Sequence, residues 1–175
     1  MGGGGLSAPA PRPAPGVVDV WHLELDGPTR LRPPVRPPAR RLIVERSRVP
    51  GTSERLYRAV GAGWGWNDRL SWPAVRWADW ERRVETLVAF ADGEEAGYAE
   101  LEVHGPARVE IAYFGLLPRF HGLGLGGHLL THALRRGLEL APLVSVQTCS
   151  LDGPHALANY RARGLELVAT ETRPR

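Results

Sequence analysis

The chain has 175 residues, of which 43% are apolar, and this length and composition suit one globular domain with a tail or linker. Its 22 basic residues outnumber its 19 acidic residues by three, so the net charge alone does not indicate a nucleic-acid-binding protein. All the basic residues are arginine, which excludes enzymes that need a lysine: P-loop NTPases, protein kinases and Schiff-base enzymes.

Nothing in the sequence points to a membrane or to an oxidising compartment. There is no run of about 18 apolar residues, and the first residues lack the charged start and apolar stretch of a signal peptide. Cys149 is the only cysteine, so an intramolecular disulfide and a cysteine-rich zinc site are both excluded. We therefore expect a soluble, cytoplasmic protein without a membrane partner.

The N-terminal segment is rich in proline and is expected to lie apart from the domain. Residues 1–16 are mostly glycine, alanine and proline, which predicts a disordered tail. Residues 17–40 should form an extended arm, in which 17–25 could make a short strand before five prolines oppose helix and central strand alike. Seven arginines against one acid, between Arg30 and Arg48, could attract a polyanion, although a solvated segment is the simpler interpretation. The domain should occupy residues 41–175.

Within that domain, hydrophobic periodicity and the glycine and proline positions predict ten elements. In chain order these are strand 41–48, helices 53–62 and 73–84, strands 86–91, 95–104 and 108–116, helix 125–140, strand 143–149, helix 155–163 and strand 165–171. Thr52 or Ser53 should cap the first helix, and Asp92-Gly93 should form a hairpin turn. This order predicts a mixed α/β fold, in which a mostly antiparallel central sheet carries helices on both faces.

A glycine-rich stretch, RFHGLGLGG at 119–127, lies between a predicted strand and a predicted helix. Glycines let the backbone approach a ligand closely, and the N–H groups at a helix start bind a pyrophosphate. Gly122, Gly124 and Gly127 also fit the spacing of a dinucleotide-binding fold, but no acidic residue follows about 20 positions later to hold a ribose. The stretch therefore predicts an anion site, and argues against a Rossmann domain.

With its flanks, the segment VEIAYFGLLPRFHGLGLGGHLLTHALRRGLE resembles the acyl-CoA signature of the GNAT superfamily of N-acyltransferases, with Arg119-x-x-Gly122-x-Gly124 as its motif. ALANYRARGLELVATE resembles the later GNAT pattern of a helix with a tyrosine, then a glycine and the last strand. The resemblance covers roughly residues 41–171. It implies a GNAT-like fold, acetyl-CoA as co-substrate and no metal.

The same resemblance implies where acetyl-CoA binds: its pyrophosphate on the backbone N–H groups of residues 121–126, and its pantetheine arm beside residues 114–116. The implied contact residues are Phe114, Gly115, Leu116, Arg119, His121, Gly122, Leu123, Gly124, Leu125 and Gly126. The chain departs from the family pattern at Asp152-Gly153-Pro154, where many relatives have asparagine, and at Leu165, where they have phenylalanine. The first departure affects a CoA contact, and the second affects the core.

Acyl transfer to an amine needs a base for the ammonium proton and an acid for the leaving thiolate. Tyr160 matches the tyrosine that many GNAT members use as the acid, although it could also only pack and form a hydrogen bond. Glu110 lies where the family often carries a base. The alternatives are that Glu110 only attracts a cationic acceptor, or that water relays the proton.

The strand register can be predicted from the turn between the strands at 95–104 and 108–116. If Val103 faces Val109, then Leu101 faces Ile111 and Ala99 faces Tyr113 on one apolar face. The same register puts Glu102 opposite Glu110, with Glu100, Tyr98, Ala112 and Phe114 on the second face. Neighbouring carboxylates favour the protonated form of each other, which suits a base, and Glu100 and Glu102 could also bind the acceptor.

Five of the six tryptophans fall between Trp64 and Trp80, where the family places the variable region over its acceptor site. Trp64 and Trp66 are expected to line that site, and Asp68 with Arg69 could orient a polar substrate. Trp77 and Trp80 have helical spacing and are expected in the core.

Two further groups are weaker candidates. His128 and His132 lie one helical turn apart but have no third ligand in view, so no metal site is expected. Cys149 is expected to be a buried small residue and not an acyl carrier.

The leading hypothesis is therefore an N-acetyltransferase that moves an acetyl group directly from acetyl-CoA to a primary amine of a small molecule. The alternatives are a protein N-terminal or aminoacyl-tRNA acetyltransferase, and a catalytically idle acyl-CoA-binding module. A nucleic-acid partner is not expected, and a homodimer is left open.

Overall fold

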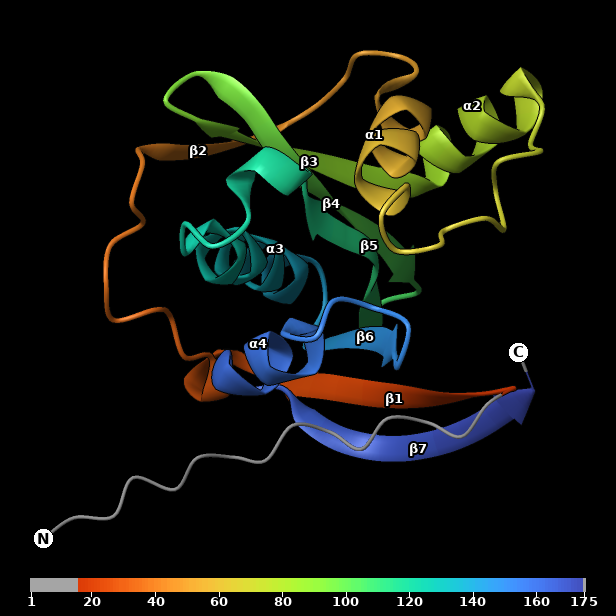
Figure 1. The fold of residues 1–175 in the computed structure, drawn as a ribbon. Helices are drawn as coiled ribbons and strands as arrows, with labels where there is room; N and C mark the ends of the chain where they lie inside the picture. Colours follow the sequence, from red (N-terminus) through yellow and green to blue (C-terminus); the bar gives the residue numbers. More distant parts are fainter. Residues whose placement is uncertain (1–15, 175) are drawn as a thin grey trace, which may run out of the picture.

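In the computed structural model, which describes residues 16–174, one seven-stranded sheet carries helices on both faces (Figure 1). The strands run in the order β2-β3-β4-β5-β6-β1-β7, and only β5 and β6 pair in parallel. The predicted α/β class with a mostly antiparallel sheet is confirmed. Apart from Gly16, the expected tail at 1–16 lies outside the described residues.

All ten predicted elements are present, with ends that differ from the prediction by a few residues. They follow the N-terminal strand β1 Val17–Asp26 and are β2 Leu42–Arg46, α1 Thr52–Gly61, α2 Ala74–Arg83, β3 Val84–Ala91, β4 Glu94–His104, β5 Arg108–Leu116, α3 Leu125–Leu140, β6 Leu143–Cys149, α4 Ala156–Ala162 and β7 Glu166–Pro174. Short 3₁₀ turns occur at Pro28–Arg30 and Pro118–Phe120.

The N-terminal strand β1 lies inside the sheet, between β6 and β7. Leu23 of β1 pairs with Val146 of β6 on one side and with Leu167 of β7 on the other. Leu23 and Leu25 are fully buried, so their apolar side chains help to form the main core. The sheet thus takes in residues that the sequence analysis grouped with the arm, and only residues 27–41 remain as a connection between sheet strands.

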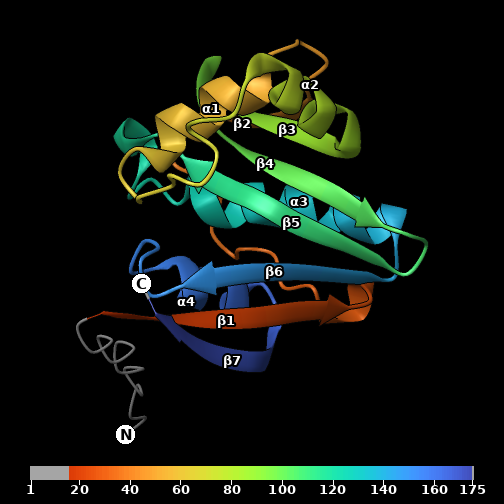
Figure 2. The same ribbon diagram turned by 90° about the vertical axis from the view of Figure 1, so that its right-hand side faces the viewer.

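The two faces of the sheet carry different helices (Figure 2). Leu101 of β4 packs in one cluster with Leu130 and Leu134 of α3, whereas Tyr98 of β4 packs with Leu56 and Val60 of α1. Because side chains alternate along a strand, these contacts place α3 on the face opposite α1. The core is therefore split into two layers by the sheet.

The start of α1 corrects one prediction, because neither Thr52 nor Ser53 caps the helix. Gly51 occupies the cap position in the left-handed conformation, at φ 80°. The carboxylate of Glu81, from α2, instead accepts the backbone N–H groups of Gly51 at 3.0 Å and Ser53 at 2.9 Å. A carboxylate satisfies free N–H groups at a helix start well, so the distant acid replaces the local hydroxyl.

Candidate active site

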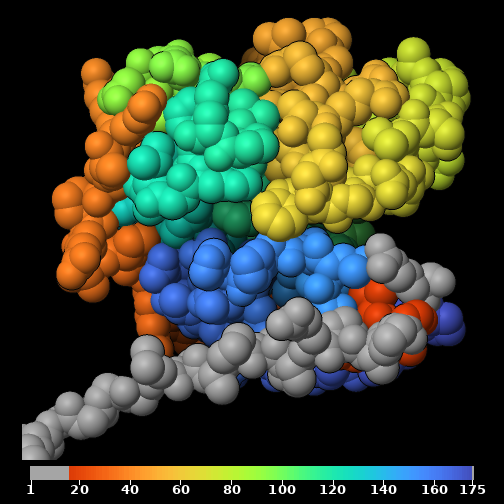
Figure 3. Space-filling model, in the orientation of Figure 1, coloured from red at the N-terminus to blue at the C-terminus, as the bar shows by residue number. Residues whose placement is uncertain are grey.

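A cavity of about 800 Å³ opens where the loop before α3, the Trp64–Arg69 segment and the α4 region meet (Figure 3). Its lining also includes the second half of β5 and the end of β6. The cavity therefore collects side chains from segments that lie far apart in the sequence. Such concave sites with a few converging polar groups are where small ligands bind.

The cavity exists because β5 and β6 pair over only part of their length. Their parallel pairing covers Arg108–Ile111 of β5 and Leu143–Val146 of β6 and ends there. The next residues of both strands, from Ala112 and from Gln147 onward, line the cavity. Two neighbouring strands that stop pairing leave backbone groups available to a ligand between them.

A register shift in β5 accompanies this opening and corrects part of the predicted pairing. Val103–Val109, Leu101–Ile111 and Glu102–Glu110 face each other as predicted. Beyond them the register shifts, so that Glu100 faces Tyr113 and Ala99 faces Phe114. The predicted Ala99–Tyr113 pair is therefore wrong, and Tyr113 and Phe114 exchange faces.

The physical reason is a bulge that puts one extra residue, Ala112, into β5. Tyr113 then packs with Trp80 and Tyr57 on the α2 side, and Phe114 joins the α3 side beside Tyr160. No glycine or proline marks the bulge in the sequence.

The glycine-rich loop forms one wall of the cavity and leads directly into α3. Gly122 and Gly124 both have left-handed backbones, at φ 76° and 72°, which a residue with a side chain adopts only at a cost. Gly124 is also the residue before α3, a helix of 16 residues, so free N–H groups and the positive helix end lie at the loop. This is a cradle for a phosphate group.

Most of the expected CoA-contact residues come together at this wall. Those that line the cavity are Phe114, Gly115, Leu116, His121, Gly122, Gly124, Leu125 and Gly126. Leu123 instead lines a second, smaller cavity on the other side of the loop. The side chain of Arg119 lines neither cavity: its guanidinium lies 3.4 Å from a Glu94 carboxylate oxygen and covers the Phe120 ring.

Tyr160 lies on the α4 side of the cavity, 6.0 Å from Phe114 between ring centroids, and is only 5% exposed. Burial raises the pKa of the Tyr160 phenol well above its ordinary value, and the negative charge of Asp152 raises that pKa further. The phenol is thus protonated at neutral pH and has a proton to donate. Asp152 also lines the cavity, and accepts hydrogen bonds from the Thr148 hydroxyl at 2.6 Å and the Cys149 N–H at 3.0 Å.

Glu110 and Glu102 both reach the cavity from neighbouring strands. An Oε2 atom of Glu110 lies 3.1 Å from Nε2 of His104, which is 3.7 Å from Glu102. Glu102 also binds Arg83. The Glu110 side chain is 31% exposed and the Glu102 side chain 13%, so Glu110 is the more accessible of the two carboxylates.

Glu100 is placed differently from the other two acids. It is 1% exposed, does not line the cavity, and accepts hydrogen bonds from the Ser53 hydroxyl and from Trp80 Nε1 at 2.7 Å. Burial raises the pKa of the Glu100 carboxyl to about 7. Glu100 therefore supports the cavity wall from behind, through its hydrogen bond to Trp80. Among the described residues it does not reach the cavity surface, where a substrate contact was expected.

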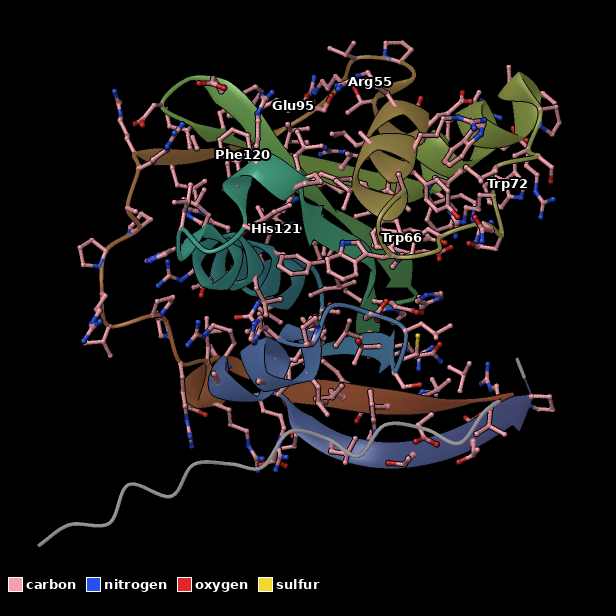
Figure 4. All side chains as sticks on the ribbon, viewed as in Figure 1. Arg55, Trp66, Trp72, Glu95, Phe120 and His121 are labelled. Atoms are coloured by element: carbon pink, nitrogen blue, oxygen red, sulfur yellow. The ribbon has the colours of Figure 1, made fainter. Side chains whose placement is uncertain are left out.

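The tryptophan-rich segment forms the opposite wall (Figure 4). The Trp64 ring lies 5.8 Å from that of His121, and the Trp66 ring lies 5.0 Å from that of Tyr113. Figure 4 shows Trp66 and His121 on the two segments that flank the opening. Trp80, which was expected in the core, is buried and also lines the cavity.

Asp68 and Arg69 are held at this wall by aromatic residues. Asp68 accepts hydrogen bonds from the hydroxyls of Tyr57, at 2.6 Å, and Tyr113, at 3.0 Å. The Arg69 guanidinium lies over the rings of Trp80, Tyr113 and Trp72 at 3.7, 4.5 and 4.4 Å. Both charged groups are thus fixed in position before a ligand binds.

The end of β6 and the start of α4 also line the cavity, and apart from Asp152-Gly153-Pro154 their contribution was not predicted from the sequence. Thr148, Cys149, Gly153, His155 and Asn159 all line the cavity. Cys149 is half-buried there, and burial raises the pKa of its thiol, which disfavours the reactive thiolate. The sequence signal for this contribution is the strand–helix–strand order of β5, α3 and β6, because a helix is the usual connection between two neighbouring parallel strands.

Two further findings concern residues 16–174 as a whole. No three His, Cys, Asp or Glu side chains gather there in a group that could hold a metal ion. No helix in that range is long and apolar enough to cross a membrane.

Comparison with known proteins identifies relatives of this fold. Residues 53–165 match the family described as the acetyltransferase (GNAT) family. A GCN5-related N-acetyltransferase from Kribbella flavida has a TM-score of 0.64 at 19% identity, and the match covers 90% of this chain and 58% of that chain. A tandem GNAT protein from the clavulanic acid biosynthesis pathway has a TM-score of 0.57 at 19% identity, with 90% and 54% covered.

A Bacillus subtilis acetyltransferase in complex with CoA has a TM-score of 0.54 at 21% identity, with 74% of this chain and 79% of that chain covered. At these identities the structures establish likeness of fold only. The chain spans less than two thirds of the first two structures. No curated protein matches the sequence significantly.

Proposed function

Because the chain belongs to the acetyltransferase (GNAT) family, we propose that it transfers an acetyl group from acetyl-CoA directly to a primary amine of a small molecule. One observation carries the proposal: a single cavity joins the phosphate cradle at Gly122 and Gly124 to Tyr160 and to the carboxylates of Glu102 and Glu110. The donor and acceptor chemistries thus share one space.

The residues of the cavity fit acetyl-CoA. The pyrophosphate binds the N–H groups at the start of α3, where no side chain of Gly122 or Gly124 blocks its approach. The pantetheine arm lies along the part of β5 that no longer pairs with β6, from Phe114 to Leu116. This path brings the thioester close to the bulge at Ala112, between Tyr160 and Glu110.

In the transfer step, Glu110 removes a proton from the ammonium form of the acceptor, directly or through a water molecule. The amine nitrogen forms a bond to the thioester carbon, and the carbon–sulfur bond breaks. The leaving thiolate of CoA takes the proton of the Tyr160 phenol, and the nitrogen now bonded to the acetyl carbon loses its surplus proton, which restores the phenol. The products are the acetylated amine and free CoA, and no acetyl group is held on the protein.

The acceptor side of the cavity favours a cationic, partly apolar amine. Asp68, Glu102 and Glu110 supply negative charge, and the rings of Trp64 and Trp66 supply rigid apolar surface. An ammonium group is attracted to both kinds of surface.

The test is a screen for thiol release from acetyl-CoA against a library of amines, with Glu110→Gln and Tyr160→Phe as variants. We expect release above background with a cationic amine, and strongly reduced release in both variants. Binding of acetyl-CoA without amine-dependent release in the wild type would instead support an idle acyl-CoA-binding module.

A further inference from the structure

Arg69 places a positive charge at the acceptor end of the first cavity, and aromatic rings hold it there. Its side chain is only 13% exposed, and its guanidinium carbon lies 3.7 Å from the centroid of the Trp80 ring and 4.5 Å from that of Tyr113. Trp72, labelled in Figure 4, covers the same group at 4.4 Å. Aromatic faces attract a guanidinium and fix its plane, but they leave its N–H edge without an oxygen to bind.

The N–H groups of Arg69 lack a carboxylate partner at hydrogen-bond distance. Its Nη1 atom is buried and has no hydrogen-bond partner among the described residues. The carboxylate of Asp68 is 3.7 Å from its Nε atom, too far for a hydrogen bond, and both oxygens of that carboxylate already accept a tyrosine hydroxyl. By contrast Arg173, which also lines the cavity, donates to Glu171 at 2.9 and 2.7 Å. A largely buried guanidinium with unused N–H groups is costly, and an anionic group bound to it offsets that cost.

The acids of the cavity lie close to this cation, because they share the Trp80 ring with it. Arg83, which binds Glu102, lies over that ring at 5.4 Å, and Arg69 lies over it at 3.7 Å. Glu110 faces Glu102 on the neighbouring strand. All of these residues except Arg83 line the cavity. The acceptor end therefore presents a fixed cation and two carboxylates around one indole ring.

We infer that the acceptor is an amino acid, whose carboxylate binds Arg69 and whose ammonium group lies at Glu102 and Glu110. The inference rests on the proposed function, because it names the class of acceptor for the same site. A carboxylate is planar, carries one charge and accepts two parallel N–H bonds from a guanidinium. A phosphate group fits less well, since its charge of nearly two would meet a single guanidinium beside the acids of the cavity.

The carboxylate takes no part in the transfer step itself. The amine nitrogen still forms the bond to the thioester carbon, and the product is an N-acetylamino acid. Arg69 thus fixes which amines are positioned for the reaction, and its loss should raise KM with little change in kcat.

The test measures thiol release from acetyl-CoA with free amino acids and with the matching amino acid carboxamides. A carboxamide keeps the amine and the side chain and replaces the carboxylate by a neutral group of nearly the same shape. For the best amino acid, we expect kcat/KM in the wild type to exceed that of its carboxamide by at least about tenfold, as hydrogen bonds to charged groups give.

Variants of Arg69 assign this preference to its side chain. Arg69→Gln should raise KM for the amino acid by about tenfold and leave kcat/KM for the carboxamide unchanged, which also shows that the variant folds. Arg69→Lys keeps the charge but loses the parallel donors, so its KM should lie between the two. Arg76→Gln is the matched control, because Arg76 also lies over the Trp72 ring, at 4.1 Å, but is exposed and lines neither cavity. It should leave both acceptors unaffected.

Equal kcat/KM for amino acids and carboxamides in the wild type would overturn the inference and leave the proposed function standing. The same holds if only amines without a carboxylate support release. An equal loss for both acceptors in Arg69→Gln would also overturn it, because Arg69 would then act only by packing against the rings. If acetyl-CoA binds but no amine of either kind, nor of the wider library, supports release, both the inference and the proposed function are wrong.

Discussion

The two cavities differ in charge although they share the wall formed by Gly122, Gly124 and Gly127. The first takes its acids from β4, β5, the Trp64–Arg69 segment and the loop before α4, while the second takes its arginines from the segment after β1 and from the end of α4, at its C-cap residue Arg163. The three shared glycines provide only neutral backbone N–H groups to both cavities. What binds on either side is decided by the segments that pack against it.

The largest effect is expected from a variant that removes the general acid of the first cavity and leaves the second cavity unchanged. Tyr160→Phe removes the hydroxyl whose proton is donated to the leaving thiolate, so kcat should fall by about 10²–10⁴-fold. Affinity for acetyl-CoA should stay within about twofold, because the ring and its packing remain. Steady-state kinetics and calorimetry measure the two quantities.

The matched control for this variant is Tyr98→Phe. Tyr98 is fully buried, lines neither cavity, and its hydroxyl has no partner in the part of the chain that the structure describes. Its kcat should be that of the wild type. An equal loss of kcat in both variants would show that Tyr160 acts only through packing.

The second prediction separates Glu100 from the acids of the first cavity. Its pKa is about 7 in the folded chain against an ordinary 4.5, so the folded state binds the proton more tightly than the unfolded state. The resulting stability is complete below about pH 4.5 and is lost as the pH rises to about 7, by about 3 kcal/mol. Glu100→Gln should therefore gain stability over the wild type at pH 8 but not at pH 4.5, in urea denaturation.

Glu102→Gln is the control, because Glu102 reaches the cavity and binds Arg83. It should alter KM for the acceptor, whereas Glu100→Gln should not. A stability difference for Glu100→Gln that is the same at both pH values would contradict the account of this buried carboxyl.

The third prediction concerns the shared wall. Gly124→Ala forces a side chain into the left-handed conformation, which costs about 1–2 kcal/mol and distorts the phosphate cradle. Affinity for acetyl-CoA should fall on the order of tenfold, measured by calorimetry. Gly105→Ala has the same kind of backbone, at φ 69°, in a turn that lines neither cavity, so it should lose stability and keep full affinity.

The smallest effect is expected at the acceptor wall. Asp68→Asn keeps one oxygen that accepts a tyrosine hydroxyl, replaces the other oxygen by an amide that can only donate to the second hydroxyl, and removes one exposed negative charge. KM for a cationic amine should rise about threefold with kcat unchanged, since an exposed charge contributes little. Asp79→Asn is the control, because Asp79 lies on α2 and lines neither cavity. If Asp68→Asn raises KM for a neutral analogue of the acceptor as much as it raises KM for the cationic amine, the effect is not one of charge.

Much of the fold follows from local patterns in the sequence. Helix α3 begins after Gly124 and ends before Pro142, and the pairing of Val103 with Val109 follows from the turn between β4 and β5. The glycine-rich loop can also be predicted from the sequence, because its residues are contiguous. These features depend on neighbouring residues only.

The remaining features depend on contacts between distant segments. The bulge at Ala112 is linked to the point where β5 leaves β6, and the burial of Glu100 requires Ser53 and Trp80 from two helices. The insertion of β1 between β6 and β7 likewise cannot be predicted from a short apolar run. The side chain of Arg119 turns to Glu94 because that carboxylate lies within reach only in the folded chain.

The central claim is that acetyl-CoA binds across the glycine-rich loop. Titration calorimetry of the full chain with acetyl-CoA tests it most directly, with Gly124→Ala and Gly105→Ala measured alongside. We expect one molecule to bind per chain, with an affinity that Gly124→Ala weakens and Gly105→Ala leaves unchanged. No detectable binding to the wild type, or binding that Gly124→Ala leaves unchanged, would contradict it.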